Sequence, residues 1–205
     1  FFTRPLTVFY QTCPEMVFPE LEQPLPDREP FQVTGLDRYA LGSWILEKEV
    51  PESGYWLARA SGRLPLGNQG RLAWQHLVQA VRPIQVLARK WVPDIPCEPV
   101  SVDLALAGFQ IQGTVGDLYD VEGTVVRCVT DFGRIHAGRL IRNWILHLAV
   151  TLMLPDISVT TRIIGTDPIR PKTVGMQVFT PVGDAARSCL ENLAAFYVHG
   201  LTHPW

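Results

Sequence analysis

The chain has 205 residues, of which 47% are hydrophobic and 19% are charged, and its formal net charge is −2. This length fits one domain with a sizeable core, and the small net charge gives no global attraction to nucleic acid or to a membrane surface. The strongest apolar run, residues 145–154, is too short to span a bilayer. The chain starts at Phe1 without methionine or a signal-peptide layout, so we expect a piece of a longer protein.

The first third of the chain predicts three helices and a linker. A short amphipathic helix is expected at about Leu6 to Cys13, followed by a proline-rich linker from Pro14 to Pro30. Helical spacing of apolar residues returns from Leu36 to Glu49 and again from Gln69 to about Val81. The last of these helices either ends there or resumes beyond Pro83.

Charge is unevenly distributed along the chain. Residues 1–52 contain nine acidic and four basic residues, whereas residues 53–93 contain no acidic residue. The basic residues of that stretch are Arg59, Arg63, Arg71, Arg82, Arg89 and Lys90, and a second basic group follows at Arg134, Arg139 and Arg142. These groups indicate either a solvated or subunit-facing surface, or a surface that contacts phosphates through the forked donors of arginine.

The remaining sequence predicts strands and two more helices. Three β-rich runs span Val100 to Leu106, Phe109 to Val115 and Thr124 to Thr130, and the segment from Gly116 to Asp120 separates the second from the third. An apolar helix is expected from Ala137 to Leu154, then strands at Ser158 to Ile164 and Val174 to Thr180. A last helix should begin at Pro181, with Asp184 near its N-terminus, and end at His199 with Gly200 as its C-cap.

This order of elements predicts an α/β fold. We expect a helical N-terminal part at residues 1–98 and an α/β core at residues 99–205, together forming one structural domain. A helix, three strands that can pair antiparallel, a helix and a further strand make up the skeleton of the restriction-endonuclease-like, PD-(D/E)XK fold. A central mixed sheet flanked by helices should result.

Several stretches resemble the C-terminal, nuclease-like domain of RecC-type subunits. The opening Phe1-Phe2-x-x-Pro5 resembles the start of such domains in the RecB, RecC and AddB group. Further matches lie in order along the chain: Glu29-Pro30-Phe31, Gly35-Leu36-x-Arg38-Tyr39, Ala60-Ser61-Gly62-Arg63-Leu64-Pro65, Phe109-Gln110-Ile111-Gln112-Gly113 with the following segment to Trp144 and His147-Leu148, and Tyr197-x-x-Gly200-Leu201-Thr202-x-Pro204.

The resemblance implies a place in the gamma subunit of exodeoxyribonuclease V, a cytoplasmic helicase–nuclease complex that processes DNA double-strand breaks. It implies RecB-like and RecD-like partner subunits and DNA at a duplex end or fork, with neither a membrane nor a small-molecule substrate. Recognition of Chi sequences is not expected of this domain, because the resemblance assigns it mainly to upstream parts of RecC.

The same resemblance locates a nuclease centre whose chemistry is missing. Active relatives hold Mg²⁺ with two carboxylates and orient water with a lysine. Here the aspartate position of the G-x-I-D pattern is Gly116, the second carboxylate position is Val129, and the lysine position is Asp131. The glutamine of a following Q-x-x-x-Y motif becomes Arg142. We therefore expect no catalytic residue, no metal and no cofactor, with Arg134, Arg139 and Arg142 as candidates for DNA binding.

An active nuclease with relocated ligands is the alternative. Asp117, Asp120 and Asp131 would hold the metal and Arg134 would replace the lysine, although Asp117 and Asp120 also suit a hairpin turn. His147 is expected to pack in the core or at an interface. The tryptophans are expected in the core, or as exposed platforms for unpaired bases, at Trp44, Trp56, Trp74, Trp91 and Trp144.

The cysteines favour reduced thiols. Cys13, Cys97, Cys128 and Cys189 are far apart, without a CxxC pair or a histidine at ligand spacing, so neither a metal site nor a disulfide framework is indicated. We expect most of the four to be buried.

Overall fold

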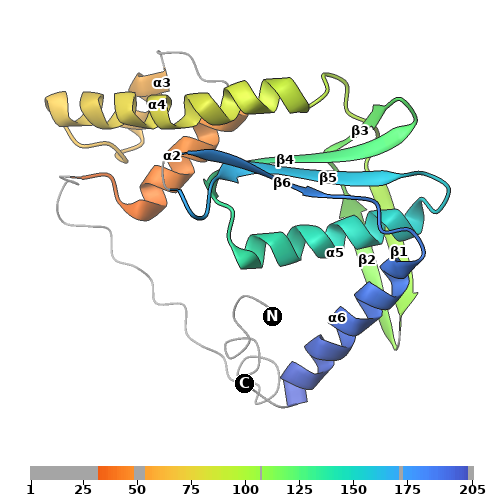
Figure 1. Ribbon diagram of the computed structural model, residues 1–205. Helices are drawn as coiled ribbons and strands as arrows, with labels where there is room; N and C mark the ends of the chain where they lie inside the picture. Colours follow the sequence, from red (N-terminus) through yellow and green to blue (C-terminus); the bar gives the residue numbers. More distant parts are fainter. Residues whose placement is uncertain (1–31, 49–53, 107, 171–172, 203–205) are drawn as a thin grey trace.

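The computed structural model describes residues 32–48, 54–106, 108–170 and 173–202. The predicted helix at residues 6–13 and the linker at residues 14–30 lie outside them. The described part contains a four-stranded mixed sheet with helices on both faces and a separate two-stranded hairpin (Figure 1). The predicted α/β class, with a central mixed sheet flanked by helices, is confirmed.

The central sheet has the order β3-β4-β5-β6. Strands β3 (Leu118–Val121) and β4 (Thr124–Arg134) form an antiparallel pair, and β5 (Val159–Thr166) and β6 (Val174–Phe179) form another. The middle strands β4 and β5 run parallel, because helix α5 (Ala137–Met153) carries the chain back across one face of the sheet.

Helices α2 (Gly35–Lys48), α3 (Gly54–Ala60) and α4 (Gly67–Trp91) form one layer, and α2 and α4 cover the face of the sheet opposite α5 (Figure 1). Helix α4 turns an apolar stripe toward this layer's core, with the three- and four-residue spacing of a single helix face. Its buried residues are Gly70, Trp74, Leu77, Val81 and Ile84.

Helix α4 continues through Pro83, so an end at about Val81 is wrong. Pro83 is exposed, and buried residues on both sides of it hold the helix against the sheet. Strand β5 fixes the last turn of α4 through Arg162. The Trp91 carbonyl accepts a hydrogen bond from Arg162 Nη1 at 3.0 Å, and the Arg162 guanidinium lies 5.0 Å from the Trp91 ring centroid. These contacts outweigh the loss of one backbone hydrogen bond at the proline.

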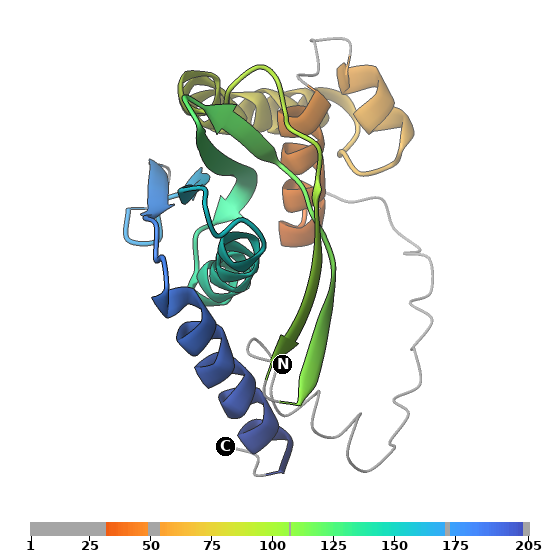
Figure 2. The same cartoon turned by 90° about the vertical axis from the view of Figure 1, so that its right-hand side faces the viewer.

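A second core lies on the α5 side of the sheet. The hairpin of β1 (Val100–Leu106) and β2 (Phe109–Val115) packs there together with helix α6 (Ala185–Thr202). Figure 2 shows the hairpin and α6 extending past α5 in the same direction. Leu148 and Val150 of α5, both fully buried, lie at the centre of this cluster.

Several predicted boundaries are corrected by the structure. Strand β3 occupies the segment that was expected only to separate two strands, and α3 was not predicted. Helix α6 starts at Ala185 rather than Pro181 and runs past Gly200, which is buried inside the helix rather than capping it.

Gly42 of α2 lies against the Phe132 ring of β4, and a methyl group at this position would overlap that ring. We expect Gly42→Ala to lower the free energy of unfolding by about 1–3 kcal/mol, since the overlap outweighs the gain in helix propensity. Gly35→Ala is the control, because its added methyl group meets nothing within 4 Å. Urea unfolding of both variants measures the difference, and equal stabilities would contradict the packing at Gly42.

Candidate functional site

Strand β4 directs alternate side chains to the two faces of the sheet. Arg127 and Asp131 reach helix α5, where Arg127 Nη1 donates to Asn143 Oδ1 at 2.7 Å and Asp131 pairs with Arg139. Cys128 reaches the opposite face, where its Sγ lies 3.5 Å from the Trp91 carbonyl oxygen. Val129 lies between Arg127 and Asp131 in the period-2 pattern, so it shares the α5 side.

The chain turns at the first of the two predicted carboxylate positions. The pairing of β3 with β4 begins at Leu118, opposite Arg127, and the Cys128 amide donates to the Asp117 carbonyl at 2.9 Å. Asp117 adopts a left-handed φ, so Gly116 lies in the connection between β2 and β3, whereas Val129 lies on β4. Neither residue supplies a side-chain oxygen.

Asp131 is engaged in structural contacts. Its carboxylate forms an ion pair with Arg139 Nη2 at 2.8 Å and accepts hydrogen bonds from Tyr39 Oη at 3.1 Å and the Gly133 amide at 2.6 Å. The side chain of Asp131 is only 19% exposed, and that of Arg139 is only 15% exposed. Asp131 therefore joins α2, β4 and α5, with little capacity left to ligate a metal.

The other two aspartates of the alternative metal site lie at turns. Asp117 adopts a φ of 60° between β2 and β3, and Asp120 Oδ1 accepts a hydrogen bond from the Gly123 amide at 3.0 Å in the β3–β4 turn. The turn role predicted for Asp120 matches this geometry. Among the residues that the structure describes, no three histidine, cysteine, aspartate or glutamate side chains are arranged to hold a metal ion.

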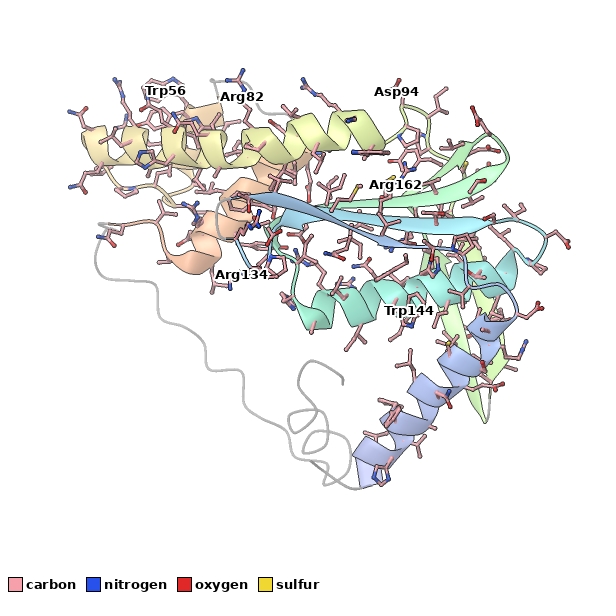
Figure 3. All side chains as sticks on the ribbon, in the orientation of Figure 1. Trp56, Arg82, Asp94, Arg134, Trp144 and Arg162 are labelled. Atoms are coloured by element: carbon pink, nitrogen blue, oxygen red, sulfur yellow. The ribbon has the colours of Figure 1, made fainter. Side chains whose placement is uncertain are left out.

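The three candidate arginines do not have equal roles. Arg134, at the end of β4, and Arg142, on α5, are exposed, whereas Arg139 is largely buried and its charge is balanced by Asp131. The structure thus leaves two of the three predicted side chains available to phosphates. Figure 3 shows Arg134 on the α5 side of the sheet.

Sequence reasoning missed Arg127, which is 6% exposed within the α5 face of β4. Burial lowers the pKa of its guanidinium, Asp117 opposes that shift, and Arg142 adds to it. Arginine stays protonated despite such a shift, so a buried positive charge lies on the same face of β4 as Val129. The available signal was a lone charge within the apolar run Val125-Val126-Arg127-Cys128-Val129.

His147 has the packing role that its apolar neighbours predicted. It is fully buried on α5, its Nδ1 lies 3.0 Å from Thr161 Oγ1, and its ring stacks on Trp144 with centroids 5.3 Å apart. Burial lowers the pKa of His147, against an opposing hydrogen bond to the backbone of Thr180. The ring therefore belongs to the core in its neutral form.

The tryptophans and cysteines divide between the core and the surface. Trp74 is buried, and the other core candidates Trp44, Trp91 and Trp144 are partly buried, but Trp56 is 57% exposed. Of the described cysteines only Cys128 is buried, and Cys97 is exposed, so the expectation of mostly buried thiols is wrong for them. Burial raises the pKa of the Cys128 thiol.

Comparisons with known proteins identify the family of the chain. The family model described as the RecC C-terminal domain matches residues 1–205. The chain belongs to the RecC C-terminal domain family. It is also 31% identical over 117 residues to the RecBCD enzyme subunit RecC of Escherichia coli (strain K12), a match that covers 55% of this chain and 10% of that protein. The chain thus corresponds to a small part of this curated relative.

The neutral, buried state of His147 predicts a pH dependence of stability. A lowered folded-state pKa means that the unfolded chain binds the proton first, so stability is fully present above the usual value of about 6.5 and falls as the pH drops below it. One such group contributes a slope of at most about 1.4 kcal/mol per pH unit.

We expect His147→Gln to flatten the stability profile between about pH 5 and 6.5, a window above the usual carboxylate pKa values. His76→Gln, at an exposed position of α4, should retain the wild-type slope. Urea unfolding across this pH range measures both slopes. If the two variants lose the slope equally, His147 is not its source.

Proposed function

We propose that this domain is a restriction-endonuclease-like, PD-(D/E)XK fold that no longer performs nuclease chemistry. The succession of α4, a β1–β2 hairpin, β3 and β4, α5 and β5 has the order of that fold. The mixed sheet with α4 on one face and α5 on the other supports it further.

The observation that carries the loss of chemistry is the state of the two carboxylate positions, Gly116 and Val129. Mg²⁺ requires oxygen ligands, which neither glycine nor valine supplies through a side chain. The third position, Asp131, replaces a lysine by a carboxylate that is bound to Arg139 and Tyr39. A metal would have to break the ion pair and would still lack the other two ligands.

The domain's role is then assembly and DNA handling within a RecC-type subunit. The curated relative is a subunit of the RecBCD enzyme, so the parent protein would act with RecB-like and RecD-like chains in cytoplasmic processing of double-strand breaks. Exposed Arg134 at the end of β4, and exposed Arg142 of α5 close to buried Arg127, give the α5 side basic groups suited to phosphates near the fork. No described helix is long and apolar enough to cross a membrane.

The full parent subunit, without its partners, should leave forked DNA intact in Mg²⁺ or Mn²⁺. Asp131→Ala should lower the free energy of unfolding by about 2 kcal/mol, since it leaves Arg139 unpaired, and Asp117→Ala should change stability less. Gel analysis of labelled forks detects cleavage. Metal-dependent cutting that disappears in either variant would instead establish a nuclease with relocated ligands.

Replacement of the two exposed arginines should weaken DNA binding through lost phosphate contacts. For Arg134→Ala/Arg142→Ala in the parent subunit, we expect the slope of log K against log salt concentration to decrease by about 2 in magnitude. Arg187→Ala, an exposed arginine of α6, is the control. Titration of a fluorescent fork at several salt concentrations gives the slopes, and an unchanged slope would exclude this surface from phosphate contact.

A further inference from the structure

Helix α4 carries a second stripe on a face that flanks its buried one, about a third of a turn away. Arg71, Gln75, Val78, Arg82 and Val86 follow one another at spacings of three or four residues and are all exposed. A stripe with this spacing lies along one face of the helix. Figure 3 shows Arg82 on the side of α4 that faces away from the sheet.

Two open grooves follow this outward stripe. The first, of about 540 Å³, is lined by α3 and the first half of α4, and the second, also about 540 Å³, continues along the second half toward β6. Gln79 lines both, so the two grooves adjoin at the middle of the helix. The stretch of α4 from Arg71 to Lys90 that lines them is roughly 30 Å long at the α-helical rise per residue.

The described residues that line the two grooves are basic or uncharged. Arg71, Arg82 and Lys90 line them, and no acidic side chain of the described residues does. Like charges disfavour each other, and an acidic partner would relieve that repulsion.

The apolar residues of this surface favour a protein over a single strand of nucleic acid. Val78 and Val86, 36% and 63% exposed, line the grooves, are aliphatic and offer no ring on which a base can stack. Trp56 is exposed, but the Arg59 guanidinium lies 5.6 Å from its centroid and Tyr55 contacts it edge-on. Burial of aliphatic side chains is a gain that a partner helix provides and a sugar–phosphate chain does not.

We propose that the outward face of α3 and α4 is a docking surface for an acidic amphipathic helix of a partner chain. Apolar side chains of that helix, at three- and four-residue spacing, fill the grooves beside Trp56, Val78 and Val86. Its carboxylates pair with Arg71 and Arg82. The inference rests on the assembly role proposed above and specifies which surface performs it and what chemistry the partner presents.

The test uses the full parent subunit and its full-length RecB-like and RecD-like partners, each in a separate binding titration at several salt concentrations. Arg82→Glu should weaken association with one partner about tenfold and reduce its salt dependence, whereas Arg187→Glu on α6 should match the wild type. Val78→Ser/Val86→Ser should weaken the same association without changing its salt dependence, because no charge is altered. Serine resembles valine in helix propensity, so α4 is retained.

Forked DNA and single-stranded oligo-dT are titrated against the same variants. The proposal expects Val78→Ser/Val86→Ser to bind both DNAs like the wild type. If Arg82→Glu loses DNA affinity while partner association is unchanged, the surface contacts nucleic acid and the proposal is wrong. If wild type and all variants associate equally well, assembly uses another surface and only this inference fails. If the wild type associates with neither partner, the assembly role fails with it.

Discussion

The Asp131 carboxylate is the contact on which the arrangement of this domain depends. It holds Arg139 at the start of α5, the Tyr39 hydroxyl of α2 and the backbone amide of Gly133. Helices on opposite faces of the sheet are thereby joined through one residue of β4, just where the pairing of β4 with β5 becomes irregular. Because a partly buried ion pair loses its stabilisation when either partner is removed, replacement of Asp131 carries a structural cost.

Basic side chains set the electrostatics of the α5 side of β4. Burial and exposed Arg142 lower the pKa of Arg127, whereas Asp117 raises it. Asn143 orients Arg127 through its amide oxygen and is itself fixed by donating to the Arg139 carbonyl. In the proposed role, exposed Arg134 and Arg142 would attract a phosphate to this side.

Local signals predicted much of the fold, while tertiary contacts decided what they missed. Strands at Val100–Leu106 and Phe109–Val115 match their predicted bounds because alternation and a glycine turn specify a hairpin locally. Pro83 and Gly200 suggested helix ends that the structure does not have. Both residues disfavour helix by propensity, but both lie within helices, α4 and α6. The sequence did not predict β3, because the turn-forming residues Asp117 and Asp120 favoured a connection over a strand. Arg139's pairing with Asp131 likewise depends on the approach of α5 to β4, which no sequence spacing reveals.

The sheet separates the two candidate surfaces of the domain. Arg134 and Arg142 lie on the α5 side, whereas Trp56 and Arg82 lie beyond α4 on the other side, as Figure 3 shows for Arg82 and Arg134. Side chains of β4 and β5 fill the space between them, with Ile163 on the α5 face and Ile164 on the α4 face, both fully buried. More than one packed layer therefore separates a substituted charge on one surface from the other surface. At ordinary salt, the interaction between exposed charges is also screened over a length of about 10 Å. Because distant, independent sites contribute additively, DNA contact and partner contact can vary separately in this fold, an independence that a single active cleft would not allow.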